Sequence, residues 1–130
     1  MIHGIGTDII EVKRVKKALQ ANSGFRDRVF SAEEVRYCEE ASGNAKFERY
    51  AARFAAKEAF LKACGTGLRE GFGLSEITVV HTELKQPCIR LAGKSRETFE
   101  SKIGGTVHLS ISHLSGIAHA VAVVENKPKD

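Results

Sequence analysis

The stretch ARFAAKEAFLKACGTG, residues 52–67, decides how this chain folds. Alanine is the best helix former, and neither glycine nor proline interrupts residues 47–64, so the sequence predicts one long helix that ends before Gly65. One stripe of that helix carries only small residues at helical spacing: Ala52, Ala56, Ala59 and Ala63. Such a stripe allows the helix to pack closely against a sheet.

The segments around the long helix predict strands and shorter helices. Residues 2–8 read as a short strand that ends at a polar loop. Residues 106–113 alternate apolar and polar side chains, and residues 117–125 form an apolar strand that would pair with them as an antiparallel hairpin. We also expect a helix to begin at Ser31, because Glu34 completes a capping box. The remaining expected elements are a basic amphipathic helix at 11–19, strands at 76–83 and 88–91, and a helix at 94–103.

Size and composition indicate one domain that spans residues 1–130. No apolar run approaches the roughly 20 residues of a membrane span, and the first residues lack the basic leader of a signal peptide, so we expect a cytoplasmic protein. The 3 cysteines include no C-x-x-C pair, which argues against a disulfide framework or a zinc site. A net charge of +4 suits an anionic partner, whether nucleic acid, a phosphate-rich small molecule or an acidic protein.

Charged residues near the end of the long helix, together with one distant aspartate, point to a metal and a diphosphate. Glu58 and Lys62 are helical neighbours, and an ordinary solvated ion pair would account for their spacing. The turn Gly65-Thr66-Gly67 follows, and because a helix C-terminus repels phosphate, an anion there would need cations such as Lys57 and Lys62. Asp8, expected at a strand end, could join Glu58 around a divalent cation, since Mg²⁺ takes one or two carboxylates and completes its shell with water and phosphate oxygens. The pattern predicts a magnesium and diphosphate site and leaves the solvated ion pair open.

Segments in the order GIGTDIIEVKRV at 4–15, RFAAKEAFLKACGTG at 53–67 and SISHLSGIAHAVAV at 110–123 resemble one known family. They are similar to the holo-acyl-carrier-protein synthase family of 4′-phosphopantetheinyl transferases, and the similarity spans nearly the whole chain. The resemblance implies an enzyme that transfers the phosphopantetheine arm of coenzyme A to a serine of acyl carrier protein, with Mg²⁺, for fatty acid synthesis. Adenosine 3′,5′-bisphosphate would be released. It also implies an α+β fold, in which a mainly antiparallel sheet packs against the long helix, and a homotrimer with sites between its subunits.

The same resemblance implies roles for individual residues around the metal. Asp8 and Glu58 match the Mg²⁺ ligands. Lys57 and Lys62 would lie near the diphosphate, and Lys62 would offset the charge that develops on the leaving phosphate. Gly65 and Thr66 would lie in the turn beside the diphosphate. The acceptor of the serine proton stays open among a metal-bound water, Glu58 and Asp8.

Two further groups of residues follow from the resemblance. Arg53 and, from the neighbouring subunit, His113 are similar to residues that grip the ribose 3′-phosphate of coenzyme A. Leu114 departs from that pattern, because relatives often place a hydroxyl residue directly after the histidine. Arg14 resembles the arginine that meets the recognition helix of the acidic carrier protein. Simpler interpretations are His113 as a turn histidine, Asp8 as a helix cap and the basic helix as a solvated face.

Two other classes of protein fit parts of the sequence. A small nucleic-acid-binding module is favoured by a pI near 9.1 and by the run KRVKK at 13–17, but aromatic residues make up only 7% and no recognised nucleic-acid motif is present. An interaction module without chemistry would use the basic helix and leave Asp8 and Glu58 without a purpose. We therefore expect neither a nucleic acid nor a membrane as partner.

Overall fold

The structure is a computed structural model that describes residues 1–65 and 71–129. Thr66, predicted to lie in the turn after the long helix, falls outside the described residues. The elements follow the chain in the order β1 (Ile2–Glu11), α1 (Val12–Ala21), α2 (Phe25–Val29), α3 (Ala32–Glu39), α4 (Asn44–Cys64), the 3-10 helix η2 (Leu74–Glu76), β2 (Ile77–His81), β3 (Pro87–Leu91), α5 (Gly93–Lys102), β4 (Thr106–Leu114) and β5 (Ile117–Glu125).

The described residues contain the helices and strands that the sequence predicts. The long helix, α4, is confirmed, although it begins at Asn44, three residues earlier than expected. The capping box is also confirmed, since the Glu34 N–H donates to Ser31 Oγ at 3.3 Å and the Ser31 N–H donates to Glu34 Oε1 at 3.0 Å. Helix α2 has no counterpart in the prediction, because its 5 residues are too few to show an amphipathic period.

The first strand is longer than the sequence predicts. Asp8 lies within β1 rather than at its end, because backbone pairing with β5 continues through Asp8, opposite Ala120, to Glu11, opposite Ile117. The polar side chain does not end the strand, since ladder hydrogen bonds use only backbone groups. Strand β4 likewise extends one residue beyond the predicted 106–113 and ends at Leu114.

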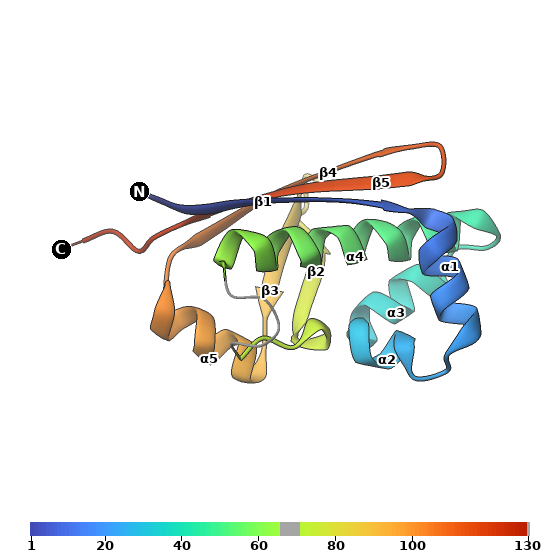
Figure 1. Ribbon diagram of the computed structural model, residues 1–130, viewed down its shortest axis with the longest axis horizontal. Helices are drawn as coiled ribbons and strands as arrows, with labels where there is room; N and C mark the ends of the chain where they lie inside the picture. The colour runs from blue at the N-terminus through green and yellow to red at the C-terminus, as the bar shows by residue number, and fades with distance from the viewer. Residues whose placement is uncertain (66–70, 130) are drawn as a thin grey trace.

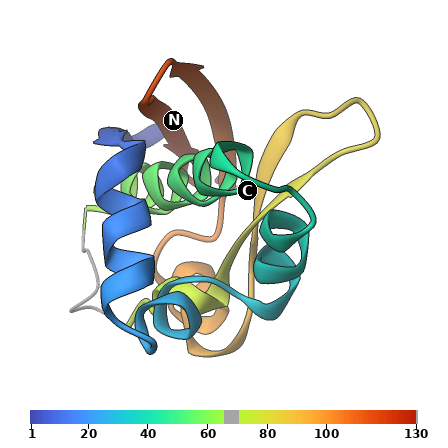
Figure 2. The ribbon, with the colours of Figure 1, turned by 90° about the vertical axis from the view of Figure 1, so that its right-hand side faces the viewer.

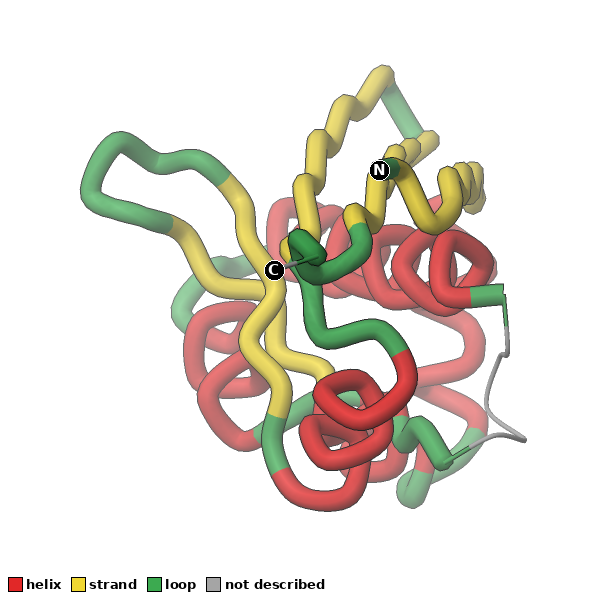
Figure 3. Tube along the Cα trace, turned by 90° about the vertical axis from the view of Figure 1, so that its left-hand side faces the viewer, coloured by secondary structure: helices red, strands yellow, loops and turns green. Residues whose placement is uncertain are grey.

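The fold consists of a sheet layer on the central helix α4, with further elements around that helix. The antiparallel sheet, in strand order β1-β5-β4, lies along one side of α4 (Figure 1). Helices α1, α2 and α3 gather near the N-terminal half of α4, whereas α5 lies near its other end (Figure 1). The β2–β3 hairpin forms a second sheet, and its turn projects from the body of the molecule (Figures 2 and 3). The predicted α+β fold, with an antiparallel sheet packed on the long helix, is confirmed. Over residues 1–65 and 71–129, no helix combines the length and the apolarity that crossing a bilayer requires.

Glycine residues of β1 allow the backbone of that strand to touch α4. A Cβ atom added to Gly6 would lie 2.0 Å from the carbonyl oxygen of Ala59, and one added to Gly4 would lie 2.1 Å from that of Ala63. Both distances are far below van der Waals contact. Only glycine therefore fits at these two positions of β1.

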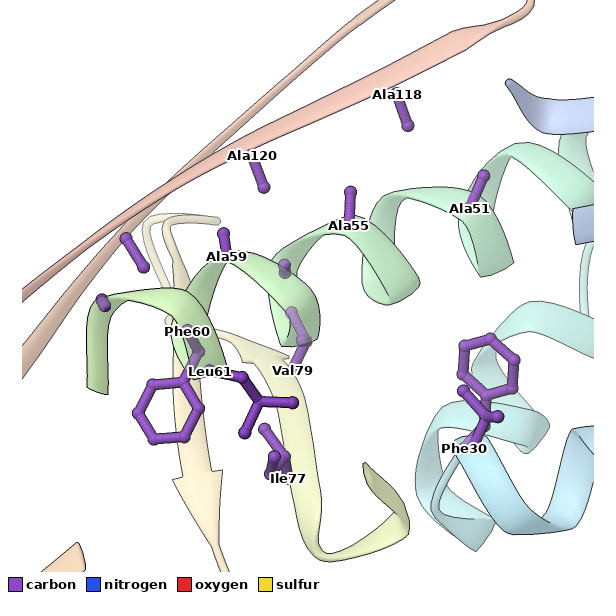
Figure 4. Packing of buried hydrophobic residues seen from close by; sticks show 14 of the residues in the cluster. Phe30, Ala51, Ala55, Ala59, Phe60, Leu61, Ile77, Val79, Ala118 and Ala120 are labelled. Atoms are coloured by element: carbon purple, nitrogen blue, oxygen red, sulfur yellow. The ribbon is translucent and has the colours of Figure 1, made fainter. Parts of the chain in front are cut away.

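Alanine residues make the corresponding contact between α4 and β5. Ala55 and Ala59 of the helix face Ala118 and Ala120 of the strand across a narrow gap (Figure 4), and all four are fully or almost fully buried. The predicted small-residue stripe is thus confirmed at its C-terminal end. At its N-terminal end it is wrong, because Ala52 is only half-buried and the stripe that faces the sheet continues through Ala55.

We expect Gly6→Ala to lower the free energy of unfolding by about 1–3 kcal/mol or more, because the added methyl group meets a helix carbonyl that has no room to move. Urea denaturation measures this change. The matched control is Gly24→Ala, where the nearest atom is the flexible end of the Arg28 side chain, and its expected cost is below about 0.5 kcal/mol. Equal losses in both variants would contradict the constraint at Gly6.

Candidate active site

Asp8 and Glu58, which are far apart in the sequence, line one hollow of about 320 Å³. Side chains alternate between the two faces of a strand, so Asp8 shares the α4-facing side of β1 with Gly4 and Gly6. Glu58 reaches the same hollow from α4. The predicted convergence of these two carboxylates is therefore present within a single chain.

Lys62 lies beside the carboxylate of Asp8. Its ammonium group donates hydrogen bonds to Asp8 Oδ1 at 3.2 Å and to the Thr7 carbonyl oxygen at 2.9 Å. The Lys62 side chain is 55% exposed and that of Asp8 only 17%, so the ammonium group remains accessible to an anion. The simple solvated pair of Glu58 and Lys62 is thus not the arrangement observed, because the ion pair of Lys62 is with Asp8.

The two carboxylates together create a demand for positive charge. Burial raises the pKa of Glu58, the negative charge of Asp8 raises it further, and Lys62 lowers it. A divalent cation would relieve this repulsion, and carboxylates are ligands that Mg²⁺ prefers. In the part of the chain that the structure describes, no third aspartate, glutamate, histidine or cysteine completes a cluster around the pair. The donor set therefore fits a cation whose other ligands are water and phosphate oxygens.

Lys57 is not in this hollow, and its predicted place beside the diphosphate is wrong for the chain as folded. Its side chain is fully buried. The ammonium group donates to Glu34 Oε1 at 2.5 Å, to the Val29 carbonyl oxygen at 2.7 Å and to the Leu74 carbonyl oxygen at 2.8 Å. An ammonium group has three N–H donors, so none is left for a ligand. Lys57 is a core residue that ties α4 to three other segments.

Glu34 completes this buried cluster. Besides Lys57, its carboxylate accepts hydrogen bonds from the backbone N–H groups of Val79, at 2.9 Å, and Ser31, at 3.0 Å. The sequence reveals Glu34 as a capping residue, but no local pattern reveals its pairing with Lys57. The two residues come from different helices, and burial of both depends on how α3 and α4 pack.

Arg53 and His113 line a second hollow, of about 280 Å³, and both belong to the same chain. Arg53 is only 4% exposed, and its Nε atom is buried without a hydrogen-bond partner among the described residues. His113 extends from β4, next to the exposed Leu114. Arg53 and His113 thus already lie together within one chain, whereas the resemblance implies His113 from a neighbouring subunit.

The two hollows open from different sides of α4. They share no lining residue. Arg53 and Glu58 are separated by five positions, which places them roughly 140° apart around the helix axis. One chain thus presents its acidic pair and its buried guanidinium in different directions.

The remaining predicted residues are Gly65, at the end of α4, and Arg14, on α1. Gly65 ends α4 in the left-handed conformation, with φ of 82°, and its N–H donates to the carbonyl oxygens of Leu61 and Lys62 at 3.1 Å each. Arg14 lines the same hollow as Asp8 and Glu58. The residue expected to meet a protein partner therefore lies immediately beside the acidic pair.

Comparison with known proteins agrees with this geometry. A family model described as the 4′-phosphopantetheinyl transferase superfamily matches residues 4–122. A holo-[acyl-carrier-protein] synthase from Geobacter sp. (strain M21) is 43% identical over 126 residues, which cover 96% of this chain and 99% of the relative. The chain therefore belongs to the 4′-phosphopantetheinyl transferase superfamily. Within that superfamily it is a member of the holo-[acyl-carrier-protein] synthase family.

Solved structures of that family share the whole fold. The crystal structure of the synthase from Neisseria meningitidis superposes with a TM-score of 0.87 at 34% identity, covering 97% of this chain and 100% of the other. The synthase from Bacillus anthracis in complex with CoA (3′,5′-ADP) superposes with a TM-score of 0.81 at 35% identity, covering 98% and 99%. The predicted family is confirmed.

Because the ammonium group of Lys57 is buried against Glu34, replacement of Lys57 by an uncharged residue should lower stability strongly. We expect Lys57→Met to lower the free energy of unfolding by about 3–5 kcal/mol, because it leaves the carboxylate of Glu34 buried without its counter-charge. Lys62→Met is the matched control on the same helix and should change stability by less than about 0.5 kcal/mol. Thermal unfolding of both variants measures the difference. Unchanged stability of Lys57→Met would show that Lys57 does not hold the core together.

Proposed function

We propose that this chain transfers the 4′-phosphopantetheine group of coenzyme A to a serine hydroxyl of an apo acyl carrier protein and releases adenosine 3′,5′-bisphosphate. The observation that carries the proposal is the convergence of Asp8 and Glu58, from two distant segments, on one hollow, with the ammonium group of Lys62 hydrogen-bonded to Asp8 at 3.2 Å. Such a set of charges matches a cation and a phosphate anion bound together. Membership of the synthase family supports the same reaction.

Asp8 and Glu58 are the residues that would hold Mg²⁺. When bound, the ion would supply positive charge to the diphosphate of coenzyme A and to the departing phosphate. The demand for positive charge around Glu58 supports this assignment, because burial and Asp8 both raise the pKa of Glu58.

The residues of the chain itself then have distinct tasks in the transfer. The serine oxygen forms a bond to the phosphorus that bears pantetheine, and the diphosphate P–O bond breaks. Lys62, whose ammonium group is accessible, would neutralise the charge on the leaving phosphate. The serine proton would pass to Glu58, to Asp8 or to a water molecule at the cation.

The second hollow would bind the 3′-phosphate of coenzyme A through Arg53 and His113. Because Arg53 and Glu58 point to different sides of α4, we propose that one coenzyme A lies between two subunits. One subunit would contribute Asp8 and Glu58, and its neighbour would contribute Arg53 and His113. The relative from Bacillus anthracis, solved in complex with CoA (3′,5′-ADP), supports a ligand of this kind.

An exposed apolar sheet face supports association of this chain with further copies, and we propose that the assembly is a trimer. Ile5 and Ile9 of β1 are 60% and 67% exposed, and they lie on the face of the sheet that α4 does not cover. Their cross-strand neighbours on β5 are Val123 and His119. An exposed apolar patch on a sheet commonly marks a protein interface.

Sedimentation equilibrium would return the mass of three chains, and a monomer at micromolar concentration would contradict the trimer.

The Glu58→Gln variant tests the site and the reaction together. With Mg²⁺, coenzyme A and apo carrier protein, the unmodified chain should add the mass of one phosphopantetheine group to the carrier. Glu58→Gln should slow this addition by on the order of 100-fold or more, as loss of one charged group at a reacting centre commonly does. Mg²⁺ should raise the melting temperature of the unmodified chain but not that of Glu58→Gln.

The stability of Glu58→Gln in the absence of Mg²⁺ provides a control, because the pKa shift of Glu58 determines whether stability should rise or fall. The pKa of Glu58 is raised by folding, so its ionised form costs stability at neutral pH, and this cost disappears as the pH falls and Glu58 is protonated. Without Mg²⁺, Glu58→Gln should therefore be at least as stable as the unmodified chain at neutral pH. The difference in stability between the two proteins should become smaller at acidic pH. An equal effect of Mg²⁺ on both proteins would exclude Glu58 as a ligand.

Reversal of charge at Arg14 tests the proposed carrier-docking surface. Arg14 is exposed on α1 beside the acidic pair. We expect Arg14→Glu to raise the KM for the carrier protein by on the order of tenfold and the KM for coenzyme A by a smaller factor. Lys17→Glu makes the same charge change on α1 outside that hollow, and its effect should be smaller. Equal effects of the two variants would indicate only a general attraction by charge.

A further inference from the structure

The second hollow contains an arrangement that the proposed reaction does not yet explain. The guanidinium carbons of Arg49 and Arg53 lie 4.1 Å and 4.2 Å from the ring centre of Tyr37. The two arginines come from α4, and Tyr37 comes from α3. A single aromatic ring of one helix therefore contacts two positive charges of another.

This arrangement is costly in the absence of an anion. Arg49 and Arg53 are neighbours on one helix face, where like charges repel each other. Arg53 is buried, and its Nε atom lacks a partner among residues 1–65 and 71–129. A buried donor without an acceptor destabilises the fold. The repulsion between the two guanidinium groups and the unpaired donor of Arg53 both destabilise the free chain. A bound anion would offset both.

Contacts with Tyr37 keep the two guanidinium groups in place. A cation over an aromatic ring is attracted by the negative face of the ring. Arg49 makes a second contact with the same residue, since its Nη1 atom donates a hydrogen bond to the backbone carbonyl oxygen of Tyr37 at 2.7 Å. Arg53 donates more weakly, from Nη1 to the Arg49 carbonyl oxygen at 3.4 Å. The Tyr37 ring is the contact that both guanidinium groups share.

The lining of the hollow favours a strongly anionic group. Arg49, Arg53 and Lys85 contribute positive charge, and Glu48 is the one acidic residue among the described lining residues. His81 also lines the hollow, and burial and then the charge of Arg53 lower its pKa, which favours the neutral ring. This excess of positive charge matches the double negative charge of a phosphate monoester.

We propose that Tyr37 is a positioning residue that holds Arg49 and Arg53 for the 3′-phosphate of coenzyme A, and that Arg49 is a second guanidinium of this site. The inference rests on the proposed function and adds a determinant of substrate choice to it. Tyr37 sets how strongly the enzyme prefers coenzyme A to 3′-dephospho-coenzyme A, which lacks only that phosphate. A phosphate bound by two oriented guanidinium groups is recognised through several N–H donors at once.

The test compares Tyr37→Leu with Tyr37→Phe on both substrates. The unmodified chain should have a lower KM for coenzyme A than for 3′-dephospho-coenzyme A. Tyr37→Leu should raise the KM for coenzyme A about tenfold, the effect expected when two ring-to-cation contacts are lost, with kcat unchanged. Its KM for 3′-dephospho-coenzyme A should not change. Tyr37→Phe keeps the ring and should retain the preference.

Arg49→Gln provides a second and independent measurement. Titration calorimetry with adenosine 3′,5′-bisphosphate should show an affinity loss of about tenfold or more for Arg49→Gln and for Tyr37→Leu, but not for Tyr37→Phe. Unchanged affinity in Arg49→Gln would overturn its role as a phosphate ligand. Equal loss of activity on both substrates in Tyr37→Leu would show a general structural role and overturn the positioning role.

These outcomes are separate from failure of the proposed function. If the unmodified chain transferred phosphopantetheine from neither substrate, the proposed function itself would fail. If it used both substrates with equal KM, transfer would stand, but the 3′-phosphate would not be bound in the hollow of Tyr37, Arg49 and Arg53.

Discussion

The close approach of β1 to α4 is the contact on which the rest of the structure depends. Gly6 places strand backbone against the Ala59 carbonyl oxygen, and its missing Cβ would also come within 2.9 Å of Lys62 Cβ. Asp8 follows two positions later on the same face of the strand, where it meets the Lys62 ammonium group. A larger residue at position 6 would push the strand outward and separate these charges. The packing of small residues and the chemistry of the site are therefore consequences of the same contact.

The opposite side of α4 is held by a different kind of interaction. Lys57 and Glu34 form a fully buried ion pair, whose desolvation is costly and is offset by further hydrogen bonds to backbone groups. Such a pair specifies one arrangement of the surrounding segments, because its donors and acceptors are satisfied only in that geometry. Lys57 and Glu58 are adjacent in sequence yet differ by about 100° around the helix, so one is a core residue and the other faces the hollow.

Most of the fold could be predicted from local patterns. The long helix, the capping box at Ser31 and the hairpin of β4 and β5 are each encoded within a few residues, by propensity, by a side-chain cap or by alternation. The sequence does not predict helix α2, because this helix is too short to show a period. It predicts the end of β1 too early, because Asp8 resembles a residue that ends a strand. In both cases the packing of distant segments, rather than the local sequence, determines the element.

The site was predictable only in part. The meeting of Asp8, Glu58 and Lys62 agrees with the prediction, whereas Tyr37 and Arg49 gave no signal because their contact joins two helices. The residue types, their helical spacing and the family resemblance were determined by the sequence alone. The burial of Lys57 and Arg53 was decided only by the tertiary structure, since helical periodicity states which residues share a face but not what that face packs against. Whether a charge on α4 is a ligand or part of the core depends on the segment that covers it, and that segment comes from elsewhere in the chain.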